Sequence, residues 1–439
     1  MAARVKLLPQ AHAWLQWVAL LAAVALLPAS ALAAVPDAWT PAINLSHTPG
    51  RSTDTAIEID PISGDIMVVW TEDGVAEFEE IVGRRRDHAA GGWLPAENLS
   101  QSADWERDGG PALVFNQQGQ GLLIWTRTYS AGQGAPDDGY DVLWRAWDGA
   151  AWSPAQVLLH GSSYLPGSPG TFGLIPVERP DSILLFITWG TGYRTAEYQD
   201  GAWSAVAPWI YLDVALGQVV EDGQGNLHAA ALGPNSNQNG NNRWFRDAYY
   251  LSSEGGGAPW SEPVNLAGTE GVASNAGLAF DGQGRLHFLW SDPDSVYSDE
   301  SLRSAIWERV YDGGSWSPNV EATAWNDAQA INGFSLAAGV TGTLHLAWSE
   351  GLQVAGAHTG LDVYYQSGDG TAWEPEQKVY TSTAQSRYPL LVVGGDGAVL
   401  AWQEEFDAGG PVLDLEVYAS RQGDTPPPVM SVYLPLIAH

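Results

Sequence analysis

Several apolar runs in this chain end in tryptophan, with a carboxylate two residues after the tryptophan. The residues that follow the runs are Glu72, Asp292, Glu350 and Glu404. A run of this kind predicts a buried strand, so the acids are expected where the strand gives way to a loop. Carboxylates in such loops can accept hydrogen bonds from sugar hydroxyls or coordinate a cation.

Arginine and aromatic residues gather in a second set of predicted loops. These residues are Arg51, Trp105, Arg107, Tyr164, Trp325, Arg387 and Tyr388. Flat aromatic side chains pack against sugar rings, and acids bind their hydroxyls, so the two sets together favour a carbohydrate ligand. A protein ligand, or a solvated acidic surface with no ligand, would have the same composition.

Calcium is the one cofactor for which the chain offers candidate ligands, and we expect no cofactor to be required. The candidates are Asp292, Asp294 and Asp299, whose oxygens suit a hard cation. Their spacing matches no defined calcium loop.

A repeat accounts for the elements that must position these loops. Tryptophan opens a short polar and apolar strand at Trp39, Trp93, Trp152, Trp203, Trp260, Trp316 and Trp373, spaced 51 to 59 residues apart. Between these lie the apolar runs that end at Trp70, Trp125, Trp189, Trp290, Trp348 and Trp402, with Ala231 in place of tryptophan in one copy. Turns rich in Asp and Gly separate the segments and favour tight hairpins.

Each repeat is interpreted as four strands, exemplified by 277–280, 285–290, 305–311 and the segment that opens at Trp316. This predicts an all-β protein, a seven-bladed β-propeller of four-stranded blades. The chain begins with a Trp-led strand, 39–45, that has no partners before it, and ends with three strands that lack a Trp-led fourth. We therefore expect the N-terminal strand to complete the last blade, which removes free sheet edges.

Asp312-Gly313-Gly314-Ser315-Trp316 and Asp369-Gly370-Thr371-Ala372-Trp373 resemble shortened Asp-box turns of the sialidase-like propeller superfamily. The resemblance covers essentially the whole mature chain and implies the propeller fold. Ser386-Arg387-Tyr388-Pro389 is also similar to the Arg-x-Pro strand of sialidases, which implies Arg387 and Glu404 as catalytic residues if the chain is such an enzyme. The segment lies in the last repeat rather than near the start, and sialidases have six blades.

Two further motifs have structural interpretations. His228, His287 and His345 recur at one position of the repeat, so they are expected to be separated around a ring and to serve the core rather than a metal. Arg84-Arg85-Arg86 is a basic run on a predicted strand, and ion pairs or a solvated face explain it better than nucleic acid does.

The N-terminal segment predicts that the protein is exported. Residues 1–34 have a positive start, an apolar run and an Ala31-Leu32-Ala33 cleavage site, which together predict a signal peptide cleaved near Ala33 or Ala34. The propeller is assigned to residues 35–424, and 425–439 form a Pro-rich spacer with a short apolar tail that cannot span a membrane. The chain has no cysteine, which excludes Cys-based catalysis.

Charge narrows the range of partners. The formal net charge of −32 disfavours nucleic acid and anionic membranes. We expect a secreted or surface-bound monomer that binds a glycan or a protein without catalysis. The alternatives are an exo-sialidase-type glycoside hydrolase and a structural or adhesion module.

Overall fold

The computed structural model describes residues 39–48, 50–73, 78–103, 106–129, 138–161, 173–234, 246–255, 259–268, 273–293, 304–323, 329–354, 357–382, 384–406 and 414–422. Every regular element in these ranges is a β-strand, which confirms the all-β prediction. None of these ranges contains a helix of the length and apolarity needed to cross a bilayer. The predicted signal peptide and the C-terminal tail lie outside the described residues.

Four antiparallel sheets are separate from one another. The first contains β7 (Glu106–Phe115), β8 (Gly121–Tyr129), β9 (Gly139–Trp147) and β10 (Gln156–Gly161). The second contains β11 (Gly173–Glu178), β12 (Ser182–Trp189), β13 (Gly192–Gln199), β14 (Ala202–Trp203) and β15 (Ile210–Tyr211). The third contains β16 (Ala215–Glu221), β17 (Leu227–Pro234), β18 (Arg246–Ser253) and β19 (Val264–Asn265). The fourth contains β20 (Asn275–Phe280), β21 (Leu286–Pro293), β22 (Ser304–Tyr311) and β23 (Val320–Glu321).

The remaining strands form three antiparallel groups. The first consists of β2 (Arg51–Ile59), β3 (Ile66–Asp73), β4 (Glu80–Asp87), β5 (Gly92–Trp93) and β6 (Glu97–Asn98). The second consists of β24 (Gln329–Ala338), β25 (Leu344–Val354), β26 (Ala357–Gly368) and β27 (Gln377–Tyr380). The third consists of β28 (Gln385–Gly394), β29 (Gly397–Phe406), β30 (Asp414–Arg421) and β1 (Ile43–Asn44). Single parallel residue pairs, Leu361 with Gln385 and Arg51 with Leu415, link these groups into one sheet.

Among the described strands, the first, β1, pairs with the last, β30. Ile43 lies opposite Ala419 and Asn44 opposite Tyr418 in antiparallel register. The Leu45 N–H also donates to the Val417 carbonyl over 2.7 Å. The N-terminal strand is therefore the fourth strand of a group whose other three strands come from the C-terminal end.

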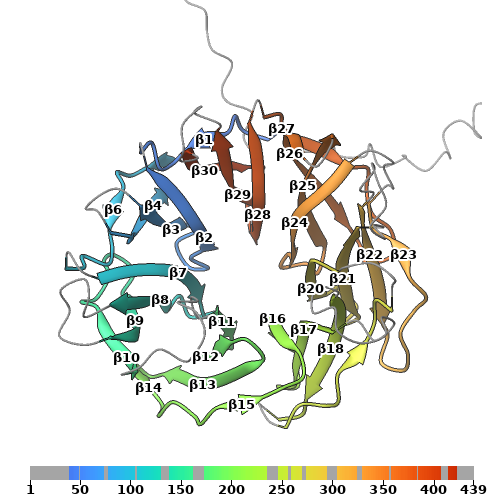
Figure 1. Cartoon of the computed structure of the whole chain (residues 1–439), viewed down its shortest axis with the longest axis horizontal. Helices are drawn as coiled ribbons and strands as arrows, with labels where there is room; N and C mark the ends of the chain where they lie inside the picture. Colours follow the sequence, from blue (N-terminus) through green and yellow to red (C-terminus); the bar gives the residue numbers. More distant parts are fainter. Residues whose placement is uncertain are drawn as a thin grey trace, which may run out of the picture. The chain divides into compact units, whose positions relative to one another are not determined.

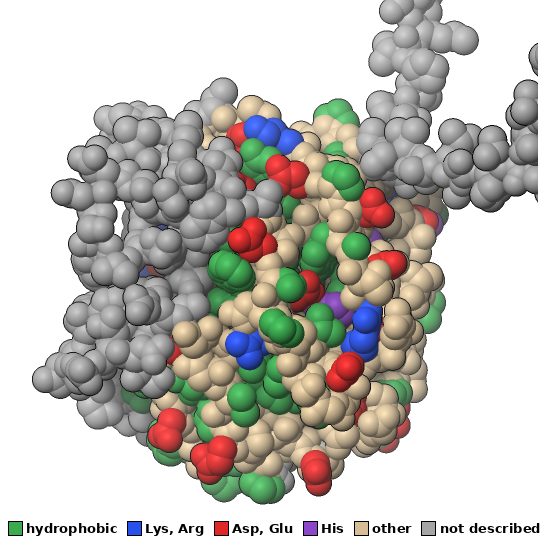
Figure 2. All heavy atoms as spheres, turned by 90° about the vertical axis from the view of Figure 1, so that its right-hand side faces the viewer, with side chains coloured by type: hydrophobic (Ala, Val, Ile, Leu, Met, Phe, Trp, Pro, Cys, Tyr) green, Lys and Arg blue, Asp and Glu red, His purple; other side chains and the backbone are tan. Residues whose placement is uncertain are grey.

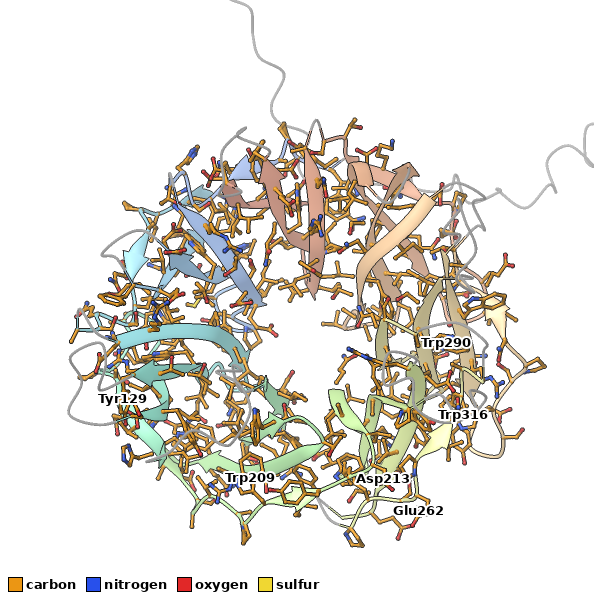
Figure 3. All side chains as sticks on the ribbon, in the orientation of Figure 1. Tyr129, Trp209, Asp213, Glu262, Trp290 and Trp316 are labelled. Carbon is orange, nitrogen blue, oxygen red and sulfur yellow. The ribbon has the colours of Figure 1, made fainter. Side chains whose placement is uncertain are left out.

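The sheets of the unit Pro41–Gln422 are arranged around a central opening, with the first strand of each group innermost (Figure 1). A cavity of about 900 Å³ is lined by the ends of β2, β7, β11, β16, β20, β24 and β28. The core lies between successive sheets, where side chains fill the space (Figure 3). The tryptophans that end the apolar runs are fully buried at Trp70, Trp125, Trp290, Trp348 and Trp402.

The Trp-led segments differ from the single outer strand that the sequence predicts. Trp152, Trp316 and Trp373 each form one isolated bridge, and regular pairing resumes only several residues later. Each of these tryptophans has a proline two residues after it. Proline has no N–H to donate to the ladder, so the strand is interrupted there.

Candidate functional site

The carboxylates after the buried tryptophans are held inside the sheets. Glu72, Glu350 and Glu404 are 1%, 8% and 0% exposed. Each accepts a hydrogen bond from the indole N–H of the tryptophan two residues earlier, over 2.8, 2.9 and 3.2 Å respectively. Their oxygens therefore accept hydrogen bonds from buried donors inside the sheets.

Serine hydroxyls at or just before the start of the preceding innermost strand complete the hydrogen bonding of two of these acids. Ser52 donates to Glu72 and Ser386 donates to Glu404, each over 2.7 Å. Ser382 also donates to Glu404. Burial raises the pKa of Glu404 to about 7, although these donors oppose the shift. Burial likewise raises the pKa of Glu350.

The candidate arginines contact different acids. Arg107 donates to both carboxylate oxygens of Glu79 at 3.1 Å and lies over the Phe78 ring. Arg387 pairs with Glu405 at 2.9 Å. Arg51 is exposed at the start of β2. In the described part of the chain, Arg107 and Arg387 are thus committed to separate ion pairs, unlike a cluster that clamps one substrate carboxylate.

Several remaining candidates cannot be placed. Trp105, Tyr164, Trp325, Asp294 and Asp299 lie outside the described residues. Asp292 belongs to β21, where it pairs with Ala305, but its side chain is not among those described. No group of three or more potential metal ligands occurs within the described ranges.

A bulge with left-handed backbone recurs near one end of four innermost strands, β2, β7, β24 and β28. The register shifts at equivalent places in each strand. The residues with positive φ there are Asp54 (49°), Gly110 (59°), Gly333 (80°) and Tyr388 (51°). Positive φ is unusual for a bulky side chain such as tyrosine, and such strain clusters at functional sites.

Neighbouring bulges touch one another. A Cβ added to Gly333 would lie 3.4 Å from Cδ1 of Tyr388, so the glycine leaves room for the tyrosine. Asp54 accepts a hydrogen bond from the backbone N–H of Gly110. Desolvation by the neighbouring strands raises the pKa of Asp54, although the residue is exposed, and this hydrogen bond opposes the shift. The Tyr388 side chain is 53% exposed, which makes it a large aromatic surface next to this backbone. We call Asp54, Gly110, Gly333 and Tyr388 the bulge arc.

The opposite ends of the innermost strands carry acids into the central cavity. Glu58 and Glu178 line it together with Asp60 and Glu221. Burial, with a smaller contribution from the nearby Glu178 charge, raises the pKa of Glu58 to about 8. Burial also raises the pKa of Glu178. The strand ends therefore concentrate acidic groups away from the bulge arc.

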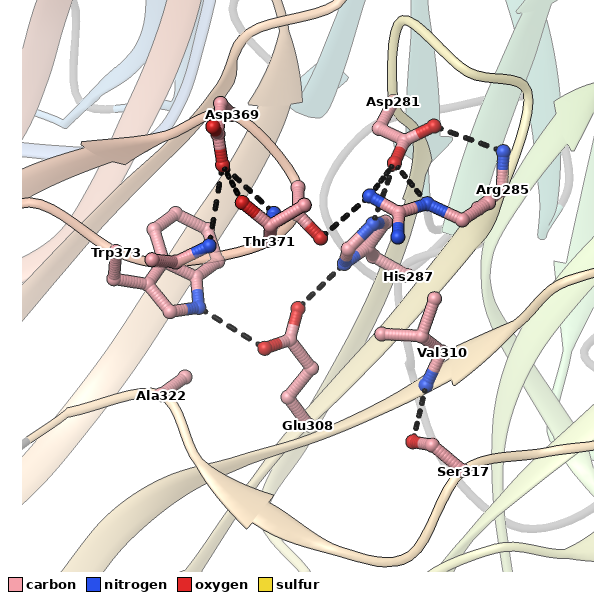
Figure 4. A network of polar contacts seen from close by, with 12 residues as sticks. Asp281, Arg285, His287, Glu308, Val310, Ser317, Ala322, Asp369, Thr371 and Trp373 are labelled. Atoms are coloured by element: carbon pink, nitrogen blue, oxygen red, sulfur yellow. Dashed lines mark hydrogen bonds and ion pairs between the residues drawn. The ribbon is translucent and has the colours of Figure 1, made fainter.

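The repeated histidines have separate partners, in agreement with their interpretation as core residues. His287 bonds Glu308 at 2.6 Å and Asp281 at 3.2 Å, and Glu308 also accepts from Trp373 at 3.0 Å (Figure 4). Elsewhere His228 contacts Tyr250 at 2.7 Å and His345 contacts Tyr365 at 2.6 Å. These histidines couple strands within a sheet, and the Glu308 bond to Trp373 couples two sheets.

Sequence reasoning missed Asp54 and Glu58. Neither follows an apolar run that ends in tryptophan, which is the pattern that singles out the other acids. A comparison of the segments Arg51–Ala56 and Arg107–Ala112 offers one signal, because both begin with arginine and have Asp54 or Gly110 at the fourth position, residue types that tolerate positive φ.

Comparison with known proteins gives structural matches only. No family model matches the chain, and no curated protein matches it. A protein of unknown function from Dyadobacter fermentans is similar at 13% identity and a TM-score of 0.47, covering 89% of this chain and 98% of that one. YCF48 bound to D1 peptide is similar at 14% identity and a TM-score of 0.48, covering 89% and 99%.

The NanB sialidase of Streptococcus pneumoniae is similar at 9% identity and a TM-score of 0.46, covering 88% of this chain and 70% of that one. The matches thus include a sialidase, the kind of protein that the Asp-Gly turns resemble.

Proposed function

We propose that the chain is an exported, seven-bladed β-propeller, closed by the pairing of β1 with β30, that binds a carbohydrate at the bulge arc without catalysis. The grouping of strands supports this architecture, since each strand group has one innermost strand on the shared cavity. The pairing of β1 with β30 supports closure because it joins the two ends of the strand array.

Tyr388 is the observation that supports ligand binding most directly. A tyrosine that is half exposed and held at a φ of 51° is unfavourable for stability alone. Its ring offers a flat apolar surface for a sugar ring, with a hydroxyl for hydrogen bonding. Asp54, in the same arc, supplies a carboxylate that can accept hydrogen bonds from sugar hydroxyls.

Binding is favoured over hydrolysis because the acids expected to do chemistry have other partners. Glu404 is fully buried against Trp402, Ser382 and Ser386. Arg387 pairs with Glu405. Acidic side chains are dispersed over the face seen in Figure 2 rather than gathered in one patch, which also disfavours a site defined by charge alone.

A glycan array with and without Ca²⁺ tests the proposal. We expect the wild-type chain to bind a defined group of glycans and Tyr388→Ala to lose that binding. Tyr211→Ala is the matched control, because Tyr211 is a 68% exposed tyrosine on the outer strand β15. Binding that survives Tyr388→Ala would contradict the proposal. Turnover of a fluorogenic sialoside that Arg387→Ala abolishes would favour the hydrolase instead.

A further inference from the structure

A second pocket, separate from the bulge arc, lies between two neighbouring strand groups. It has a volume of about 270 Å³ and is lined by residues of β4, β6 and β9 and by the turn that follows β9. Its lining includes Gly83, Arg85, Arg145, Trp147 and Trp152.

Gly83 distinguishes β4 from the corresponding strands of other groups, because Leu99 and Val69 occupy the position that a side chain at Gly83 would take. In β4, Gly83 lies opposite Val69, the residue before the buried Trp70. The corresponding positions in three other groups hold Trp144, Tyr250 and Glu308. These larger side chains contact the Trp-led segment of the next group: Trp144 meets Trp203, Tyr250 meets Trp316, and Glu308 accepts a hydrogen bond from Trp373. Gly83 has no side chain to offer to Trp152.

Two arginines face this space from opposite walls. Side chains alternate along a strand, so Arg85 lies on the same face of β4 as Ile81, and Arg145 lies on the same face of β9 as Leu143 and Trp147. Ile81, Leu143 and Trp147 belong to one core cluster between the two groups. The Arg85 guanidinium lies 5.5 Å from the centre of the Trp147 ring.

The two guanidinium groups differ in their partners. Arg85 forms an ion pair with Asp65. Within the described residues, Arg145 has no carboxylate at ion-pair distance, and burial lowers its pKa. Glu97, the one carboxylate in the lining, is exposed and pairs with neither arginine. An unpaired and partly buried cation is unfavourable unless an anion compensates it.

Buried hydrogen-bond donors without an acceptor also gather in this lining. Nε of Arg145 and Nε1 of Trp147 are both buried and have no acceptor within the described part of the chain. Trp147 is only 7% exposed. Buried donors are normally satisfied, so two in one pocket indicate a bound acceptor.

We propose that this pocket binds a carboxylated sugar residue, of the kind that a uronate in an acidic polysaccharide presents. The carboxylate is recognised by Arg145 together with Arg85, because a planar guanidinium matches a carboxylate in two-point geometry. The sugar ring packs against the indole of Trp152, which lines the pocket. This site does not depend on the bulge arc.

Calorimetric titration with methyl β-D-glucuronide tests the assignment, with methyl β-D-glucoside as the neutral comparison. We expect the glucuronide to bind at least about 10-fold more tightly than the glucoside, and Arg145→Gln to weaken its binding by about 10- to 100-fold, as loss of a charge-assisted hydrogen bond predicts. Arg145→Lys keeps the charge but loses two-point geometry, so it should lie between the two.

The controls separate this site from general charge effects and from the bulge arc. Arg309→Gln makes the same charge change on β22, where Arg309 bonds Asn319, and should leave glucuronide binding unchanged. Tyr211→Ala, which removes an exposed tyrosine outside both sites, should also leave it unchanged. The glycan-array test depends on Tyr388 and this test depends on Arg145, so the two can fail separately. Equal binding of the glucoside, unaltered binding by Arg145→Gln in a folded variant, or no glucuronide binding at all would overturn the proposal.

Discussion

The indole N–H of Trp402 donates to the carboxylate of Glu404, two residues further along β29, over 3.2 Å. Residues two apart lie on the same face of a strand, so the tryptophan and the acid are buried together. The same relationship joins Trp70 to Glu72 and Trp348 to Glu350. A carboxylate is thus buried in several sheets beside the largest core side chain, which makes stability sensitive to pH.

Replacing Glu404 with glutamine should reduce the loss of stability with rising pH. The pKa of Glu404 is raised from 4.5 to about 7 in the folded chain, so the folded state holds the proton more tightly than the unfolded state does. This contribution is fully present below pH 4.5 and is lost as pH rises through 7, by about 3 kcal/mol in total. The unfolding free energy of wild type and Glu404→Gln, measured by denaturant titration from pH 4 to 8, checks this.

The control for that experiment is Glu374→Gln, because Glu374 is exposed. It should leave the pH dependence of wild type unchanged. Parallel pH profiles for wild type and Glu404→Gln would show that the Glu404 carboxyl does not titrate as described.

His345 should have the opposite effect on the pH dependence. Burial lowers its pKa from 6.5 to about 4, so the unfolded chain binds the proton more tightly. Stability that is present above pH 6.5 is therefore lost as pH falls through 4, by about 3 kcal/mol. His345→Gln should flatten the stability profile between pH 4 and 6.5, which thermal unfolding across that range measures. An unchanged slope in a folded variant would argue against a neutral, buried His345.

Tyr388→Gly should stabilise the fold while weakening glycan binding. The backbone at Tyr388 has a φ of 51°, which glycine adopts without steric strain. Relief of this strain should raise the unfolding free energy by about 1 kcal/mol, since the half-exposed ring contributes little burial. Thermal unfolding and the glycan array measure the two effects, and a destabilised variant would show that the ring serves packing rather than a ligand.

The repeat predicted the strands well because burial on both faces leaves a clear pattern in the sequence. The expected strands 277–280 and 305–311 correspond to β20 (Asn275–Phe280) and β22 (Ser304–Tyr311). The pattern also predicted that the N-terminal strand pairs with the C-terminal strands, and in the structure β1 pairs with β30. It could not show that Glu72 and Glu404 point into the sheet, because an acid after an apolar run looks the same whether a loop or a buried donor follows.

The bulge arc and the arginine pocket were harder to foresee for a different reason. Bulges depend on a local shift in register, and one sequence gives no direct sign of it. The pocket is lined by residues from two neighbouring repeats, and one sequence does not show which residues of the two repeats meet. The basic run Arg84–Arg86 is evident in the sequence. Only the register of β4 shows that its side chains alternate between the two faces of the strand.

An engineered cross-link between β1 and β30 tests whether the two ends of the chain close the sheet array. The chain has no cysteine, so the double variant Ile43→Cys with Ala419→Cys introduces a single pair at directly opposed positions. Oxidation should form an intramolecular disulfide, which mass change on alkylation and altered gel mobility detect. The bond constrains a very long loop in the unfolded chain. The free energy of unfolding of the oxidised form should therefore exceed that of the reduced form by about 2 to 4 kcal/mol.

The matched control moves one cysteine out of register. Asn44→Cys with Ala419→Cys places the pair on diagonal positions whose side chains point to opposite faces of the sheet. This variant should cross-link poorly and gain little stability. Efficient cross-linking of both pairs would mean that β1 is not fixed against β30, and failure of the Ile43 and Ala419 pair to oxidise would argue that the N-terminal strand does not complete the last sheet.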